Sequence, residues 1–161
     1  MTNPIPPGHE GMIPHLVCTP CADAIEFYKN AFGAEEICRM LSPNDPRIMH
    51  AEMKLDGKTF YLADDFPEYC GGQSRSAVTL GGTPVTIHQY VANCDQAIDR
   101  AAKAGATVTM PATDMFWGDR YGQVVDPFGH LWAFATHQRD MTDEEMQKAA
   151  EAMFAQSAPG A

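Results

Sequence analysis

The chain has 161 residues, 45% of them hydrophobic, and a formal net charge of −10 from 21 acidic and 11 basic residues. This length and hydrophobic content suit one domain with a buried core and argue against a long disordered protein. The acidic balance, with no run of Lys or Arg, argues against a nucleic-acid partner. Because no segment approaches the roughly 20 apolar residues that span a bilayer, we also expect no membrane partner.

The start of the chain has neither the basic end nor the apolar centre of a signal peptide, which predicts a cytoplasmic location. The odd number of cysteines fits free thiols: Cys18, Cys21, Cys38, Cys70 and Cys94. Cys18 and Cys21 form a C-x-x-C motif, for which a redox or zinc site is the alternative interpretation. No second C-x-x-C accompanies this motif, and Cys18 falls in a predicted strand.

The first elements of the chain are an arm, a strand and a helix. Residues 1–12 are rich in Pro and Gly and predict an extended N-terminal arm. A strand is expected over 13–19. The helix that follows is predicted to begin with Thr19 as N-cap and Pro20 at the first helical position, and to end at Gly33.

Three short extended runs follow this helix: 35–41, 47–55 and 59–63. The Asp56-Gly57 pair between the last two favours a tight hairpin turn. The order of one strand, one helix and three strands defines a first βαβββ module over 13–69. Residues 70–84, which contain several glycines, are predicted to connect it to the next module.

The second half of the chain repeats this order and defines a second βαβββ module over 85–137. Its strands and helix are expected at 85–91, 95–104, 107–110, 122–125 and 131–135.

The remaining residues, 138–161, are predicted to form a C-terminal helix and tail. Thr142 and Glu145 make a capping box that begins the helix. Its apolar face is expected to pack on the core or on a second subunit, and it consists of Met146, Ala149, Ala150 and Met153.

The two halves are also related in sequence. Segment 15–26 aligns with segment 88–99 without gaps and places His15 over His88. Such self-similarity indicates that one supersecondary unit occurs twice. A cleft between the copies would be lined by matching positions of both, so we expect His15 and His88 in the same site.

Strand alternation separates the side chains that face the helix from those that face away. In the strand 47–55 the apolar residues are expected beneath the helix, which leaves His50 and Glu52 on the opposite, concave face. Tyr61 of the next strand is expected on that face as well. Counting back from the hairpin turns places His50 over Arg120, and so predicts that Arg120 enters the same cavity.

Trp117 lies in an aromatic loop punctuated by glycines, and such side chains are costly to expose. A ligand wall or a subunit interface explains it better than a solvated loop. Each of the other residues has a plainer interpretation. The strand histidines could be hydrogen-bonded core groups, His50 and Glu52 could lie on a solvated face, and Arg120 could be an ordinary salt-bridge partner.

Several motifs resemble one known family. They are Ala24-Ile25-Glu26-Phe27-Tyr28, His50-Ala51-Glu52, Trp117-Gly118-Asp119-Arg120-Tyr121-Gly122 and Asp126-Pro127-Phe128-Gly129-His130-Leu131-Trp132. Together they resemble the PhnB-like branch of the glyoxalase / bleomycin-resistance / dioxygenase (vicinal oxygen chelate) superfamily over residues 13–137. The resemblance implies an α+β fold in which two tandem βαβββ modules form a curved mixed sheet around a cleft, followed here by the C-terminal helix. It also implies a homodimer.

Metal-dependent enzymes of this superfamily hold a divalent ion with His from the first strand and Glu from the fourth strand of each module. Mapped through the shared turns, those positions carry Ile13, Tyr61, Thr86 and Ala133. None is a usual metal ligand, so we expect a metal-free cleft with no cofactor. The alternative is a displaced divalent metal site formed by His15, His88 and Glu52.

The sequence therefore predicts a protein that binds a small organic ligand in this cleft. Arg120 would engage an anionic or carbonyl group, Trp117 would stack on the ligand, and the histidines would form hydrogen bonds. The expected lining is His15, His50, Glu52, Tyr61, His88, Trp117 and Arg120. One alternative is an enzyme of the same superfamily, a lyase, isomerase or transferase with a cavity His as general base. Another is a vestigial cleft in a protein that acts through its dimer surface or terminal helix.

Overall fold

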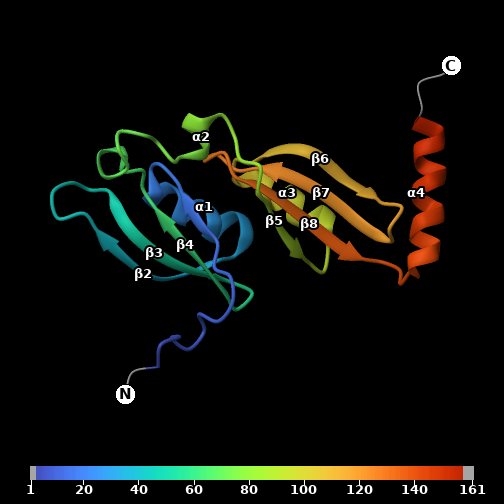
Figure 1. The fold of residues 1–161 in the computed structure, drawn as a ribbon, viewed down its shortest axis with the longest axis horizontal. Helices are drawn as coiled ribbons and strands as arrows, with labels where there is room; N and C mark the ends of the chain where they lie inside the picture. The colour runs from blue at the N-terminus through green and yellow to red at the C-terminus, as the bar shows by residue number, and fades with distance from the viewer. Residues whose placement is uncertain (1–2, 158–161) are drawn as a thin grey trace.

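A computed structural model describes residues 3–157 of the chain (Figure 1). Within these residues, eight strands form two four-stranded mixed sheets of order β1-β4-β3-β2 and β5-β8-β7-β6. The strands are β1 (His15–Val17), β2 (Glu35–Leu41), β3 (Ile48–Leu55), β4 (Lys58–Ala63), β5 (Thr86–Tyr90), β6 (Thr107–Asp114), β7 (Asp119–Val125) and β8 (Leu131–His137). The helices are α1 (Cys21–Phe32), α2 (Ala77–Leu80), α3 (Cys94–Ala104) and α4 (Asp143–Ser157), with a 3₁₀ turn, η1, at Pro67–Tyr69.

The predicted α+β fold with two βαβββ modules and a C-terminal helix is confirmed. We call β1 to β4 with α1 module 1, and β5 to β8 with α3 module 2. The curved sheet is divided into two halves, because β1 and β5 are both edge strands and are not neighbours in either sheet. Residues 1–2 of the predicted arm and residues 158–161 of the predicted tail lie outside the described residues.

The start of α1 differs from the prediction. Pro20 is the N-cap and supplies no side-chain hydrogen bond to the helix. Instead, Asp64 at the end of β4 accepts the backbone N–H of Cys21 at 3.0 Å. A carboxylate from a neighbouring strand thus replaces the local cap expected from Thr19, whereas the predicted end at Gly33 is confirmed by its left-handed φ of 76°.

The other helices begin with side-chain caps from their own sequence. Asn93 accepts the backbone N–H of Gln96 at 3.0 Å and begins α3. Thr142 and Glu145 exchange the hydrogen bonds of the predicted capping box at the start of α4, at 2.8 and 3.2 Å. The short helix α2, begun by Ser76, lies in the connector and was not predicted.

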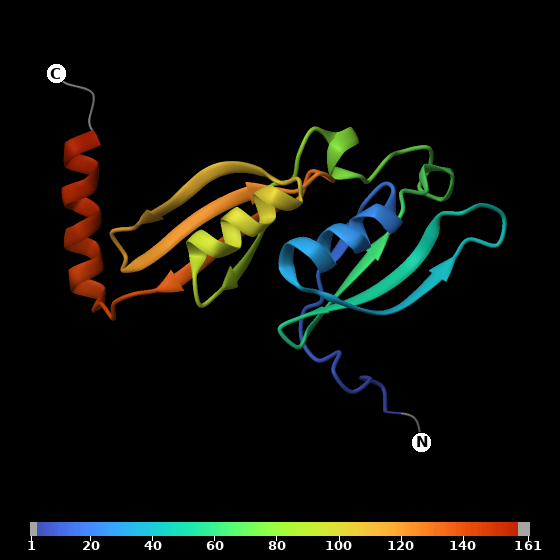
Figure 2. The same ribbon diagram turned by 180° about the vertical axis from the view of Figure 1, so that it is seen from behind.

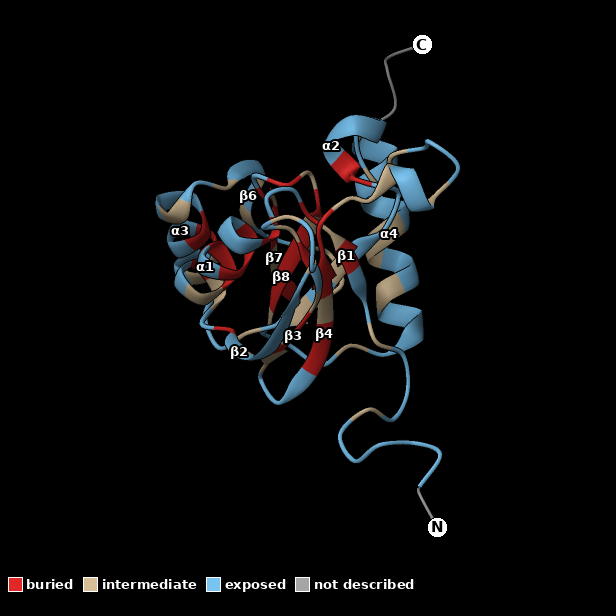
Figure 3. Cartoon of the chain, turned by 90° about the vertical axis from the view of Figure 1, so that its left-hand side faces the viewer, coloured by how far each residue is buried: buried red, intermediate tan, exposed pale blue. Residues whose placement is uncertain are grey.

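Helices α1 and α3 pack against each other on one side of the two sheets (Figures 1 and 3). The aromatic core crosses the boundary between the modules, since the ring of Phe32 lies 4.6 Å from that of Trp132 and 5.3 Å from that of Phe134. Strand alternation correctly predicted the side chains on this face, including Phe60 and Leu62, which are both buried. We call the sheet face turned away from α1 and α3 the open face.

Helix α4 stands apart from both sheets (Figure 2), on the side of the open face (Figure 3). It forms no extensive contact with another element of the described chain, and Phe154 is 65% exposed. The predicted packing on the core is therefore absent from residues 3–157, whereas packing on a second subunit stays a prediction. Over the same residues, no helix is long and apolar enough to cross a membrane.

A buried carboxylate connects the two modules. One oxygen of Asp126 accepts the hydroxyl of Tyr28 at 2.6 Å and the indole N–H of Trp132 at 2.9 Å. Its other oxygen accepts two backbone N–H groups of its own turn, both at 2.9 Å. In the same turn, Nε2 of His130 lies 3.0 Å from the carbonyl oxygen of Val17 in β1. The turn between β7 and β8 therefore holds α1 and β1 against module 2.

The substitution Asp126→Asn should lower the free energy of unfolding by about 3 kcal/mol, because an amide nitrogen cannot accept hydrogen bonds from the donors around this buried carboxylate. Urea denaturation followed by circular dichroism measures the change. The exposed Asp99→Asn on α3 is the matched control and should stay within about 0.5 kcal/mol of the unsubstituted protein. Equal midpoints for Asp126→Asn and the unsubstituted protein would show that this carboxylate does not hold the modules together.

Candidate functional site

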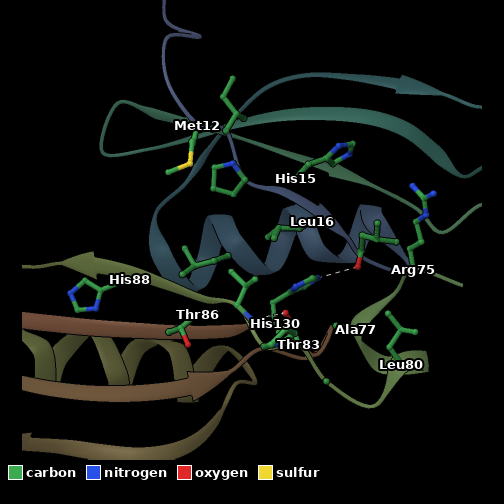
Figure 4. Close-up of a pocket in the computed structure, with 17 residues that line it drawn as sticks. Met12, His15, Leu16, Arg75, Ala77, Leu80, Thr83, Thr86, His88 and His130 are labelled. Carbon is green, nitrogen blue, oxygen red and sulfur yellow. Dashed lines mark hydrogen bonds between the residues drawn. The ribbon is translucent and has the colours of Figure 1, made fainter.

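The first strands of the two modules face one another across a groove of about 680 Å³, which we call the inter-module groove. Its lining comes from β1, β5, α2 and the segments next to them. Figure 4 shows His15 on the wall from module 1 and His88 on the wall from module 2. The structure thus brings the two repeat-related histidines to one groove.

A second hollow of about 480 Å³ adjoins this groove and shares His88 with it. It continues along β5 to Tyr90 and along β4 to Thr59 and Phe60. The open space between the modules is therefore longer than the groove alone.

On the open face of module 1, His15 belongs to a cluster of aromatic rings. The ring centroid of Tyr61 lies 4.7 Å from that of His50 and 5.9 Å from that of His15. Strand pairing places His15, Tyr61 and Glu52 in one row across β1, β4 and β3. Burial, and secondly the neighbouring His50, lower the pKa of His15. This imidazole is therefore neutral at pH 7 and able to accept a proton or a hydrogen bond.

Glu52 contacts a residue of the N-terminal arm. Nε2 of His9 lies 3.3 Å from a carboxylate oxygen of Glu52, and the His9 ring lies 6.1 Å from that of Tyr61. The hydroxyl of Thr59 donates to the carbonyl of Gly8 at 3.3 Å. The arm therefore lies along the open face of module 1. Its sequence does not predict this contact, because a segment rich in Pro and Gly has no periodic pattern that would mark a buried face.

A matching aromatic surface covers the open face of module 2. The ring of His88 lies 5.0 Å from that of Tyr90 and 5.9 Å from that of Tyr121, and Trp117 lies 5.8 Å from Tyr121. The hydroxyl of Tyr90 donates to the buried carboxylate of Asp119 at 2.8 Å. The two tyrosines, Tyr90 and Tyr121, are not among the residues that the sequence predicted for this site. The period of two from His88 to Tyr90 is the signal that could have found one of them.

The predicted position of Arg120 in the cavity is wrong. Its guanidinium donates two hydrogen bonds to Asp95 in the first turn of α3, one of them at 2.6 Å. It also donates to Asp114 at 3.0 Å. Arg120 pairs with Thr136, whose hydroxyl accepts the backbone N–H of Cys94 at the start of α3. This row of side chains therefore faces the helix and not the open face.

The error is a one-residue slip in the alignment of the modules. Strand pairing makes His50 equivalent to Tyr121 and not to Arg120. The turn over 56–57 in module 1 is shorter than the turn over 126–130 in module 2. Counting back from the two turns therefore places the residues of β7 one position out of step. Because side chains alternate with a period of two, a shift of one residue puts each of them on the wrong face.

The residues at the superfamily's metal positions do not fit a metal ion. Ile13, Tyr61, Thr86 and Ala133 present no imidazole and no carboxylate. The displaced set is not assembled either, since Glu52 contacts His9 and is not among the residues that line the groove. Across residues 3–157, no group of three or more His, Cys, Asp or Glu side chains is placed to hold an ion.

The C-x-x-C motif consists of two buried, free thiols. Burial raises the pKa of both, that of Cys21 to about 12 and that of Cys18 further. The sulfur of Cys18 lies 3.7 Å from the hydroxyl of Tyr28 in the core. Thiols that are protonated and inaccessible at neutral pH do not form a redox centre.

Comparisons with known proteins give one family. A model of the Glyoxalase/Bleomycin resistance protein/Dioxygenase superfamily matches residues 13–134. The uncharacterized protein Mb0911c of Mycobacterium bovis is 47% identical over 136 residues, which cover 84% of this chain and 89% of that protein.

Two solved structures show the same fold. The Arabidopsis thaliana gene product At5g48480 is similar with a TM-score of 0.62 and 29% identity, over 78% of this chain and 97% of that one. TioX from Micromonospora sp. ML1 is similar with a TM-score of 0.58 and 26% identity, over 83% of this chain and 100% of that one.

The substitution His15→Gln should reduce the loss of stability between about pH 7 and about pH 5. The native pKa of His15 lies below its ordinary value near 6.5, so the unfolded state binds the proton more tightly. Acidification through that window therefore destabilises the unsubstituted protein through His15, and the variant lacks this contribution. Urea midpoints at the two pH values measure it, with His88→Gln as the control for loss of a first-strand imidazole. If the urea midpoints of His15→Gln and of the unsubstituted protein depended on pH in the same way, the pKa of His15 would not be lowered in the native state.

Proposed function

Since the chain belongs to the Glyoxalase/Bleomycin resistance protein/Dioxygenase superfamily, we propose that it binds a small organic ligand in the inter-module groove. The observation that carries this proposal is that His15 and His88, equivalent in the repeat, line one groove of about 680 Å³. Such a volume, with apolar walls and a few polar groups, is typical of small-molecule sites. Within the superfamily, the motifs support the PhnB-like branch.

The remaining predicted ligand residues extend the proposed site over the two open faces. His50, Glu52 and Tyr61 would contribute from module 1 and Trp117 from module 2, where Tyr90 joins it. Arg120 has no part in the proposal, because its guanidinium is paired on the helix side. An anionic or carbonyl group of the ligand must therefore be bound by another residue.

We propose sequestration as the mode of action, without a metal or other cofactor. The basis is the residue types at the four superfamily metal positions, two of which are Ile and Ala and have no lone pair to donate. The second candidate is an enzyme in which His15 acts as general base, because this exposed imidazole, with its lowered pKa, is neutral at pH 7 and able to accept a proton. A cytoplasmic location stays a prediction from sequence.

We also propose that the protein is a homodimer in which α4 packs on a second copy. A helix of this length is marginal in water unless it packs against a neighbour. Its apolar stripe begins at Met146 and continues through Ala149 and Ala150, and Phe154 beside this stripe is 65% exposed. A closed symmetric pair would cover this surface in both copies.

Light scattering after size exclusion should give a mass of twice the 17.6 kDa chain. The substitution Phe154→Glu, or removal of the residues after Met141, should give the mass of one chain, because each removes apolar surface from the contact. Gln147→Glu on the exposed side of α4 is the matched control and should leave the dimer intact. A single-chain mass for the unsubstituted protein would refute the dimer, and an unchanged dimer after truncation would refute the role of α4.

The substitution Thr86→Trp should abolish binding of a neutral apolar dye, phenyl-naphthylamine, because the indole would fill the groove that Thr86 lines. Thr107→Trp is the matched control, since Thr107 is an exposed threonine in the same row of the same sheet but outside the groove. Dye fluorescence against protein concentration gives the affinity. No dye binding by the unsubstituted protein, or equal binding by Thr86→Trp, would refute the groove as the ligand site.

A further inference from the structure

The inter-module groove differs in charge from the rest of the chain. The chain carries 21 acidic and 11 basic residues, yet no Asp or Glu is among the 17 residues that line the groove. The ionisable side chains of the lining are Arg75 and the three histidines His15, His88 and His130. In a protein with a net charge of −10, the lining of this groove therefore presents no carboxylate to an anion.

Arg75 is the residue best placed to bind such an anion. The other five arginines donate to a partner, namely Arg39 to Glu36, Arg47 to Asp45 and Glu68, Arg100 to the carbonyl of Asn30, Arg120 to Asp95 and Asp114, and Arg139 to Met141. Within residues 3–157, the guanidinium of Arg75 forms no hydrogen bond or ion pair. Its five N–H donors are therefore available to a ligand.

The backbone around Arg75 is nevertheless held in position. Its N–H donates to a carboxylate oxygen of Asp65 at 3.1 Å, and the hydroxyl of Ser74 donates to the other oxygen of the same carboxylate. The N–H of Ser76 donates to the hydroxyl of Ser74 at 3.2 Å, and Ser76 then begins α2. The connector thus presents a free guanidinium from a fixed backbone at one end of the groove, with the side chain directed away from Leu80 of α2 (Figure 4).

The walls of the groove are apolar and open to solvent. Leu80 and Val85 are 66% and 64% exposed, and Met12 is almost fully exposed. Leu16 and Ile87 add apolar surface from the two first strands. A ligand that satisfies both the walls and the guanidinium must have an apolar body and an anionic group.

We propose that the ligand of the groove is a free organic anion, with an apolar body against these walls and a carboxylate, sulfonate or phosphate group paired with Arg75. This inference rests on the proposed function, because it names the ligand class of the same groove. Bidentate pairing with a guanidinium is the strongest polar contact available for a planar or tetrahedral anion. Neutral His15 and its equivalent His88 supply further hydrogen bonds along the groove.

Two fluorescent probes of similar shape test the inference: anilinonaphthalene sulfonate, an anion with an apolar body, and neutral phenyl-naphthylamine. The substitution Arg75→Gln should raise the dissociation constant of the sulfonate about tenfold and leave that of the neutral dye unchanged. Arg75→Lys should restore part of the affinity. Lys103→Gln, which removes the same charge from an exposed position on α3, is the matched control and should change neither probe.

Three other outcomes are possible, and each would refute a different part of the proposal. Equal sulfonate affinity in Arg75→Gln and the unsubstituted protein, with both probes excluded by Thr86→Trp, would refute the pairing with Arg75 and leave the groove as a ligand site. Sulfonate binding that persists in Thr86→Trp would place that probe elsewhere and refute the inference. Failure of both probes to bind the unsubstituted protein would refute the proposed function itself.

Discussion

The carboxylate of Asp126 is the contact on which the relative position of the two modules depends. Within residues 3–157 the sheets share no hydrogen-bonded ladder, so the modules are held together by the packing of α1 on α3, by this buried group and by side-chain contacts such as that of His130 with Val17. Its two oxygens are occupied by Tyr28 of module 1, Trp132 of module 2 and the backbone of its own turn. A buried charge with every lone-pair direction engaged holds its neighbours in one arrangement, because any displacement leaves a desolvated oxygen without a donor.

This arrangement creates the inter-module groove. Because the helices meet on one side of the sheets (Figure 3), the edge strands β1 and β5 are left on either side of the groove. The same turn that carries Asp126 sends His130 to the carbonyl of Val17, which positions the β1 wall directly. The element that joins the modules and the element that shapes the groove are therefore one turn.

The duplicated backbone carries different chemistry in its two copies. His15 and His88 are retained at equivalent positions, but the residue paired with His15 is Tyr61 and the residue paired with His88 is Ala133. The groove also receives Arg75 from the connector, which has no counterpart in the repeat. A fold of this superfamily thus supports a site whose polar groups are not those of the metal-dependent members, as expected when function resides in side chains and not in the fold.

The amino-acid sequence by itself determined the order of the elements and the buried face of most strands. Alternation and helical periodicity are local properties, and the repeat of 15–26 in 88–99 identified the second module. For the same reason the pairing of His15 with His88 could be predicted, since equivalent positions of a repeat occupy equivalent places in the fold.

Only the tertiary structure decided the register between the modules and the partners of long side chains. The longer turn at 126–130 shifts β7 by one residue and sends Arg120 to the helix side, a difference that a count along the chain cannot detect. Arg75 and His9 reach the groove or the open face through contacts between segments distant in sequence. Such contacts depend on which acceptors the fold brings within hydrogen-bond distance, and no local pattern encodes that distance.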